Sequence, residues 1–312
     1  MVETAAPRET YGKTLAELGR TNRNIVVLDA DLSPSTMVKY FAAEFPERFF
    51  NIGIAEADML GTAAGLAASG KIPFASSFAV FATGRCYDQI RVSVAQANLN
   101  VKIVATHAGV TVGEDGGSHQ ALEDLSLICA LPGFSVIVPS DSIETDRVIR
   151  TIAGHYGPCY VRLPRGKLPV INRPDYEFKI GKATLLRAGH DVTIIAIGVM
   201  VSAALEAAEI LAVEGIDCRV LNMASVKPVD ESAIIAAAVE TGAIVTAEEH
   251  QRHGGLGSIV AEVAAAGHPV PMEFVAVKDV FGQSGTPEEL LAHYGLTAGD
   301  IVSAVHRVIE RK

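Results

Sequence analysis

Short apolar runs alternate with longer segments of helical spacing along the chain. The apolar runs predict strands at residues 25–28, 49–52, 72–78, 101–106, 135–138 and 159–163. The segments between them predict helices at residues 34–45, 56–68, 81–98, 119–130 and 142–153. Strands that are apolar on both faces and joined by helices are typical of a parallel sheet covered on both sides. Asp141 precedes the last helix and is predicted to be its N-cap.

A polar segment rich in Pro and Gly, residues 164–182, predicts an interdomain linker. The alternation then resumes, with strands predicted at residues 192–197, 217–222, 243–247 and 272–277. Helices are predicted at residues 201–214, 230–240, 256–266 and 287–309, the last one interrupted near Gly295. We therefore predict an α/β protein of two doubly wound domains, residues 1–170 and a smaller domain at residues 185–312.

Composition narrows the class of protein. The 312 residues are 49% hydrophobic, which excludes a disordered chain, and 26 basic against 36 acidic residues give a net charge of −10. That charge argues against nucleic acid or an anionic membrane as partner, although a few local Arg and His residues could still bind anionic metabolites. The four cysteines form no CxxC pair, and neither a secretory signal nor an apolar run of about 20 residues is visible. We therefore expect a cytoplasmic protein with free thiols.

Polar residues follow the first two predicted strands, at the sheet edge where ligands gather in open parallel sheets. Asp29 and Asp31 follow the first strand, and Ser35 lies in the next helix. They fit either a helix cap or an anion site at a helix N-terminus. Glu56 opens a helix of small residues, where it either complements the helix dipole or is a functional buried acid.

Aromatic residues gather after the third predicted strand. Phe78, Phe81 and Tyr87 lie there in a chain that has no Trp and only 6% aromatic residues. Such a group is either core packing or a platform on which a flat ring stacks.

The strongest signal is the sequence THAGVTVGEDGGSHQ at residues 106–120. His107, Asp115 and His119 stand there among four glycines, between a strand and a helix. Glycines let a backbone approach a ligand closely, and histidines bind or transfer protons near neutral pH. No further His or Cys at ligand spacing lies nearby, so we predict a functional, ligand-binding loop and no zinc site.

Two other segments keep alternative interpretations. Arg162 and Arg165 close the sixth strand, where they fit either a bidentate phosphate contact or a salt bridge. His250 and His253 precede the sequence GGLGS, which suggests a metal pair or a phosphate loop. We favour a structural turn there, because the glycines do not form the GxGxxG spacing of a nucleotide-binding loop.

Together these motifs resemble the transketolase family. The resemblance rests on DADLSPS, NIGIAEADMLGTAAGLA, FASSFAVF, THAGVTVGEDGGSHQALEDL, PSD and VRLPRG, which keep the family's order and spacing. The resemblance as a whole covers nearly the whole chain. It implies a pyrimidine-binding domain followed by the transketolase C-terminal domain. It also implies thiamine diphosphate as the cofactor.

The resemblance assigns the cofactor pocket residue by residue. Glu56 matches the catalytic glutamate that contacts N1′ of the aminopyrimidine, and Phe78 and Phe81 match the residues that flank this ring. The third aromatic position of the family is Gly84 here, which leaves Tyr87 as the candidate replacement.

The resemblance also assigns residues around the substrate. Asp31 matches an acid near the cofactor, and His107 and His119 match catalytic residues that stabilise charge on the sugar. The residues implied to bind sugar hydroxyls are His107, Asp115 and His119. The residues implied to form a clamp for the sugar phosphate are Arg8, Ser35 and Arg165.

The Gly-Asp-Gly…Asn signature that binds Mg²⁺ and the cofactor diphosphate in this family does not occur in the sequence. The resemblance therefore implies the smaller subunit of a split transketolase, with a larger partner that holds Mg²⁺ and the diphosphate in an α2β2 assembly. The implied reaction moves a two-carbon ketol unit from a ketose phosphate to an aldose phosphate, as in the pentose phosphate pathway. A deoxyxylulose-phosphate synthase-like chain, a 2-oxo acid dehydrogenase β subunit and a non-catalytic subunit stay open as alternatives.

Overall fold

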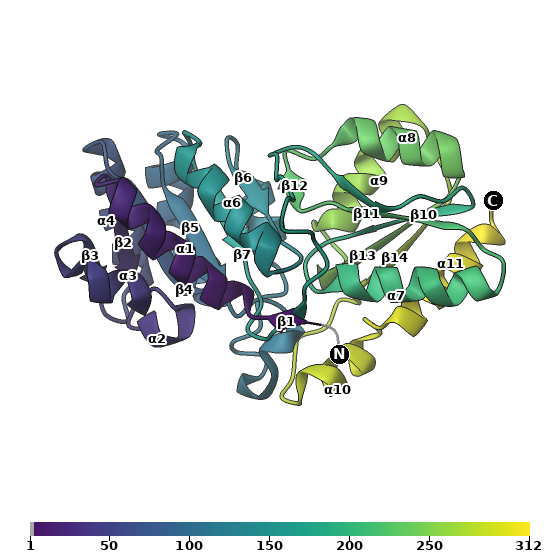
Figure 1. The fold of residues 1–312 in the computed structure, drawn as a ribbon, viewed down its shortest axis with the longest axis horizontal. Helices are drawn as coiled ribbons and strands as arrows, with labels where there is room; N and C mark the ends of the chain where they lie inside the picture. The colour runs from purple at the N-terminus through teal and green to yellow at the C-terminus, as the bar shows by residue number, and fades with distance from the viewer. Residues whose placement is uncertain (1–2) are drawn as a thin grey trace.

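Two sheets, each covered by helices, lie side by side in a computed structural model that describes residues 3–312 (Figure 1). The first sheet has seven strands in the order β12-β6-β7-β5-β4-β2-β3. Their bounds in that order are Ser225–Lys227, Ser135–Ile137, Cys159–Arg162, Lys102–Thr106, Ile72–Phe78, Ile25–Asp29 and Phe49–Asn51. The neighbours β6 to β3 pair in parallel, as predicted. β12 was not predicted, and it crosses from the second half of the chain to pair antiparallel with β6.

Helices cover both faces of this sheet because apolar side chains project from both faces of its strands. On one face lie α1 (Pro7–Thr21), α3 (Lys39–Glu44) and α6 (Ser142–Gly154), which bury Tyr11, Leu15, Phe41 and Ile149. On the other lie α4 (Glu56–Ala68) and α5 (Asp124–Cys129), which bury Met59, Leu60 and Leu125. Short α2 (Ser33–Thr36) and the 3₁₀ turn η1 (Pro46–Arg48) complete this domain's connections.

Three predicted helices differ from the structure. The helix predicted at residues 34–45 is split into α2 and α3, because the backbone at Met37 is left-handed, with φ 68°. Residues 81–98 form two π-helical segments, η2 (Phe81–Arg85) and η3 (Gln89–Ala95), in place of one α-helix. Such wide turns accommodate an extra residue and are frequent at functional sites. The helix predicted at residues 119–130 starts only at α5, because Ala121 bridges to Ala108 and its carbonyl accepts the N–H of Gly109 at 3.0 Å. That stretch closes the glycine-rich loop, so its backbone is not helical.

The second sheet has five strands in the order β14-β13-β10-β11-β9. Their bounds in that order are Met272–Val277, Ile244–Gln251, Val192–Ala196, Cys218–Asn222 and Thr184–Arg187. Four pair in parallel, whereas β9, which was not predicted, runs antiparallel at the edge. The covering helices are α7 (Met200–Val213), α8 (Glu231–Thr241), α9 (Leu256–Gly267) and α11 (Ala298–Ile309), whereas α10 (Pro287–Tyr294) packs against the 3₁₀ segment η4 (Val110–Asp115). Gly295, at φ 69°, separates α10 from α11 as predicted.

The predicted linker returns to the N-terminus and to α6. Within it, β8 (Leu168–Pro169) pairs with β1 (Thr4–Ala5). Asp141 caps α6 by accepting the N–H of Glu144 at 2.8 Å, which confirms the predicted N-cap. Its second oxygen accepts backbone N–H groups of the linker at residues 171 and 172.

The four cysteines are free thiols. Within residues 3–312, no helix has the length and apolar character needed to cross a membrane.

Candidate active site

The predicted chemistry gathers at the carboxyl edge of the first sheet. β2 ends at Asp29, β4 at Phe78, β5 at Thr106 and β7 at Arg162, and these neighbours run in parallel. In register, Phe78 lies opposite Thr106. The segments that follow these strands therefore meet at one place, as the fold class requires.

Two phenylalanines and two histidines form one aromatic cluster there. The ring of His107 stacks on Phe78, with centroids 3.8 Å apart and planes 20° apart. Phe78 and Phe81 lie 5.9 Å apart at 17°, and His119 meets Phe81 edge-on at 5.3 Å. The near-parallel phenylalanine rings provide flat apolar faces, and the imidazoles place polar nitrogens beside them.

Glu56 reaches the same cluster from α4. It is the first residue of the helix and only 4% exposed. Its two carboxylate oxygens lie 3.2 and 3.4 Å from Nη1 of Arg85. The Arg85 guanidinium carbon in turn lies 4.3 Å from the centroid of the Phe81 ring. A flat cation thus joins the buried acid to the aromatic face.

Arg85, which contacts both Glu56 and Phe81, was not predicted from the sequence to lie here. The signal that points to it is a cation in the segment FAVFATGR, directly after the position where the family has its third aromatic residue. That position, Gly84, faces open space, because a Cβ placed there meets no atom within 4 Å. Tyr87 is half-buried and packs against the hydrophobic core, and no ring–ring contact joins it to Phe78 or Phe81.

His107 has an unusual backbone and a shifted pKa. Its φ is 56°, in the left-handed region, and its Nδ1 lies 2.8 Å from the Thr106 hydroxyl. Burial lowers the pKa of His107 to about 3, and the positive charges of Arg8 and Arg165 add to the effect. The imidazole is therefore neutral at pH 7 and can both donate and accept a hydrogen bond.

The three residues of the predicted phosphate clamp lie together. Arg8 donates from Nη1 to the carbonyl of Ser35 at 2.7 Å and from Nε to the carbonyl of Arg165 at 2.9 Å. Burial and the charge of Arg165 lower the pKa of Arg8. Arg165 also pairs with Glu114 at 2.9 Å. The positive charges of Arg8 and Arg165 thus act on one another, an arrangement that favours a bound anion.

Two predicted acids stay at the surface. Asp31 is exposed at φ 63° and exchanges hydrogen bonds with Asn51 at 3.2 Å, and Asp115 is exposed at the end of the 3₁₀ segment η4 (Val110–Asp115). No side chain caps α2; Asp29 instead accepts hydrogen bonds from the N–H of Leu32, just before the helix, and from the Thr36 hydroxyl. Burial raises the pKa of Asp29 to about 6.

The remaining candidates are structural. Arg162 is buried in an ion pair with Asp124 at 2.9 Å. Of the two alternatives for Arg162, a phosphate contact or a salt bridge, the structure therefore shows the salt bridge. His250 is fully buried, which lowers its pKa to about 4, and Glu248 accepts two backbone N–H groups at the start of α9. Among residues 3–312, no three His, Cys, Asp or Glu side chains lie as a metal ion would need them.

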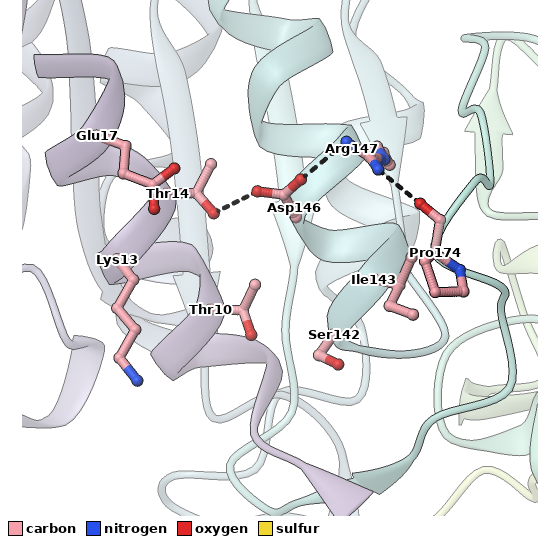
Figure 2. Close-up of a pocket in the computed structure, with 9 residues that line it drawn as sticks. All are labelled: Thr10, Lys13, Thr14, Glu17, Ser142, Ile143, Asp146, Arg147 and Pro174. Atoms are coloured by element: carbon pink, nitrogen blue, oxygen red, sulfur yellow. Dashed lines mark hydrogen bonds and ion pairs between the residues drawn. The ribbon is translucent and has the colours of Figure 1, made fainter. Parts of the chain in front are cut away.

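A separate surface pocket of about 410 Å³ lies between α1 and α6 (Figure 2). Its polar side chains largely bind one another: Thr14 donates to Asp146 at 2.8 Å, and Arg147 donates to the Pro174 carbonyl at 2.8 Å. None of the predicted site residues lines this pocket.

Comparison with known proteins gives consistent matches over both domains. The family model of the transketolase pyrimidine-binding domain matches residues 3–170, and that of the transketolase C-terminal domain matches residues 181–301. A protein of Methanocaldococcus jannaschii named as a transketolase C-terminal section is 50% identical over 98% of this chain and 96% of its own length. The 6-deoxy-6-sulfo-D-fructose transketolase subunit of a Clostridium strain is 48% identical over 98% of this chain and 95% of its own length.

Among solved structures, one described as the inactive β4 tetramer of a split-gene transketolase superposes with a TM-score of 0.93. It is 53% identical and covers 98% of this chain and 99% of its own.

Proposed function

Because this chain belongs to the transketolase family, we propose that it is the smaller subunit of a split, thiamine diphosphate-dependent transketolase. The reaction would transfer a two-carbon ketol unit from a ketose phosphate to an aldose phosphate. One observation carries the proposal: the buried Glu56 and the stacked Phe78 and Phe81 share a sheet edge with the paired Arg8 and Arg165.

The side chains at this sheet edge fit the aminopyrimidine of thiamine diphosphate. A flat heteroaromatic ring needs apolar faces and an acid, which Phe78, Phe81 and Glu56 supply. Arg85 occupies the same surroundings, so its guanidinium would have to shift from the Phe81 face when the ring binds there. The bound cofactor supplies an electron sink for cleavage of a carbon–carbon bond next to a carbonyl group.

The chain's own groups would do the rest. Glu56 would hold a proton at the pyrimidine nitrogen, and its burial removes competing water from that hydrogen bond. His107, neutral at pH 7, would donate a hydrogen bond to a sugar oxygen on which negative charge develops, with His119 beside it. Arg8 and Arg165 would hold the sugar phosphate and so fix the distance from phosphate to reacting carbon. Asp31 and Asp115, both exposed, would bind at the rims of the cofactor and sugar sites.

The proposal includes a larger partner subunit that holds Mg²⁺ and the cofactor diphosphate, in an α2β2 assembly. Supporting it, relatives that match this chain over almost their whole length are named as a section or a subunit. The related β4 tetramer is itself described as inactive.

A comparison of two kinds of donor substrate tests the proposed reaction. The chain is co-purified with a diphosphate-binding transketolase subunit and given a ketose phosphate or a 2-oxo acid as donor, with an aldose phosphate as acceptor. We expect ketol transfer from the ketose phosphate and no CO₂ release from the oxo acid. Decarboxylation of the oxo acid without ketol transfer would overturn the proposal.

A further inference from the structure

The glycine-rich loop at residues 107–120 has a backbone that neighbouring contacts must fix. Left-handed φ values occur at His107 (56°), Gly109 (82°), Gly113 (84°) and Gly116 (76°). Such conformations persist only where the surrounding structure determines them. Side chains or backbone of the second domain lie against three of these positions, Gly109, Gly113 and Gly116.

Glu249, on β13 of the second domain, contacts the base of this loop. Its Oε1 accepts the backbone N–H of Thr111 at 2.5 Å. A Cβ placed at Gly109 would lie 2.2–2.4 Å from the carboxyl atoms of Glu249, so the carboxyl group packs directly on the loop backbone. This close approach explains why glycine stands at position 109.

The direction of the Glu249 side chain is fixed by its own backbone. Arg162 of the first domain donates from Nη2 to the Glu249 carbonyl at 2.8 Å. Two residues on, Gln251 donates its N–H to the carbonyl of Leu122 at 2.8 Å. The carboxyl group is fully buried, which raises the pKa of Glu249 to about 7. Burying an acid is costly, and packing alone would be better served by an apolar residue of the same size.

The tip of the loop is also held by the second domain, through backbone contacts. Gln120 donates from Nε2 to the carbonyls of Val110 at 3.1 Å and Gln283 at 3.0 Å. A Cβ at Gly117 would lie 2.5 Å from the carbonyl oxygen of Gly282. The loop is thus clamped at its tip by backbone and at its base by a carboxyl group.

We propose that Glu249 is a positioning residue of the active site, which sets from the second domain the conformation of the loop that presents His107 and Asp115. Its action on the loop rests only on the contacts described here. Its effect on sugar binding rests on the function proposed above. The two parts are therefore tested by different measurements.

Amide hydrogen exchange, followed by NMR on the full-length chain, tests the loop. Glu249→Ala removes the acceptor, so the Thr111 amide should exchange roughly 3–100-fold faster, the range expected for loss of a hydrogen bond to a neutral or an ionised carboxyl group. Glu249→Gln keeps the length and an acceptor oxygen and should restore most of the protection. Glu248→Ala is the matched control: it should speed exchange at Leu256 and Gly257, whose N–H groups Glu248 accepts, and leave Thr111 unchanged.

Kinetics with the partner subunit test the substrate part. Glu249→Ala should raise KM for the sugar substrates at least tenfold, with C2 proton exchange of the bound cofactor unchanged, because Glu56 is untouched. If wild type shows no transfer activity, the proposed function fails while the exchange result still decides the loop contact. If Glu249→Ala does not fold, Glu249→Asp withdraws the carboxylate by one methylene and carries the same expectations. Two results would overturn the proposal. One is a Thr111 amide that exchanges at the wild-type rate in Glu249→Ala and Glu249→Asp. The other is a loss of Thr111 protection in Glu248→Ala that equals the loss in Glu249→Ala.

Discussion

Glu56→Gln separates a chemical role of this side chain from a structural one. Gln keeps the shape and hydrogen-bonding reach of Glu but cannot exchange a proton. Glu56 is 4% exposed, whereas its partner Arg85 is 54% exposed. An ion pair with a partner this exposed contributes at most about 1 kcal/mol, so the variant should fold with a melting temperature only a few degrees lower. Loss of a positioned acid–base group, in contrast, slows proton transfer by roughly 10²–10⁴-fold.

The assay is hydrogen–deuterium exchange at C2 of thiamine diphosphate bound to the complex with the partner subunit. Asp58→Asn is the matched control, because Asp58 is the other acid in the first turn of α4 and is exposed. We expect exchange to fall by at least 10²-fold in Glu56→Gln and to stay at the wild-type rate in Asp58→Asn. Equal exchange rates in all three proteins at saturating cofactor would show that Glu56 only complements the helix dipole.

Three further predictions concern the groups around Glu56. In steady-state transfer assays, Arg165→Ala should raise KM roughly 10–100-fold for phosphorylated acceptors and much less for unphosphorylated ones. An equal rise for both would indicate that Arg165 only supports the loop through its ion pair with Glu114. Arg85→Ala should tighten thiamine diphosphate binding by up to about fivefold, because the substitution frees the Glu56 carboxylate and the face of the Phe81 ring. Calorimetry measures this, and weaker binding would instead show that Arg85 contacts the cofactor. His107, whose folded pKa is about 3 against 6.5 when unfolded, should show neutral-imidazole NMR shifts down to about pH 4. Stability from the neutral ring is then present above pH 6.5 and lost as the pH falls toward 3, and protonation near pH 6 would contradict its burial.

The parallel cores of both sheets could be predicted because their strands are apolar on both faces and carry their own signal. β9 and β12 could not, because Thr184–Arg187 and Ser225–Lys227 are short, partly polar and defined only by the strand that each one joins. The helix predicted at residues 119–130 was too long for a related reason. Its first residues have helical composition, but their backbone groups are used to close the glycine-rich loop.

Site residues that follow strands were predictable, since topology alone brings the ends of parallel strands together. Phe78, His107 and Arg165 are examples, and the structure places each in the expected neighbourhood. Arg85 and Glu249 were not predictable in this way. Arg85 reaches the ring cluster through a π-helical turn, so only its place directly after Gly84 points to it. Glu249 comes from the other domain, so its position does not follow from local sequence pattern.

Activity of the separated and mixed subunits tests the central claim most directly. The chain alone, the larger subunit alone and mixtures at increasing ratio are assayed for ketol transfer at saturating thiamine diphosphate and Mg²⁺. We predict no transfer by this chain alone, and activity that rises with added partner and levels off at one larger subunit per chain. Transfer by the purified chain alone, or no transfer by a mixture shown by sedimentation to have assembled, would contradict the claim.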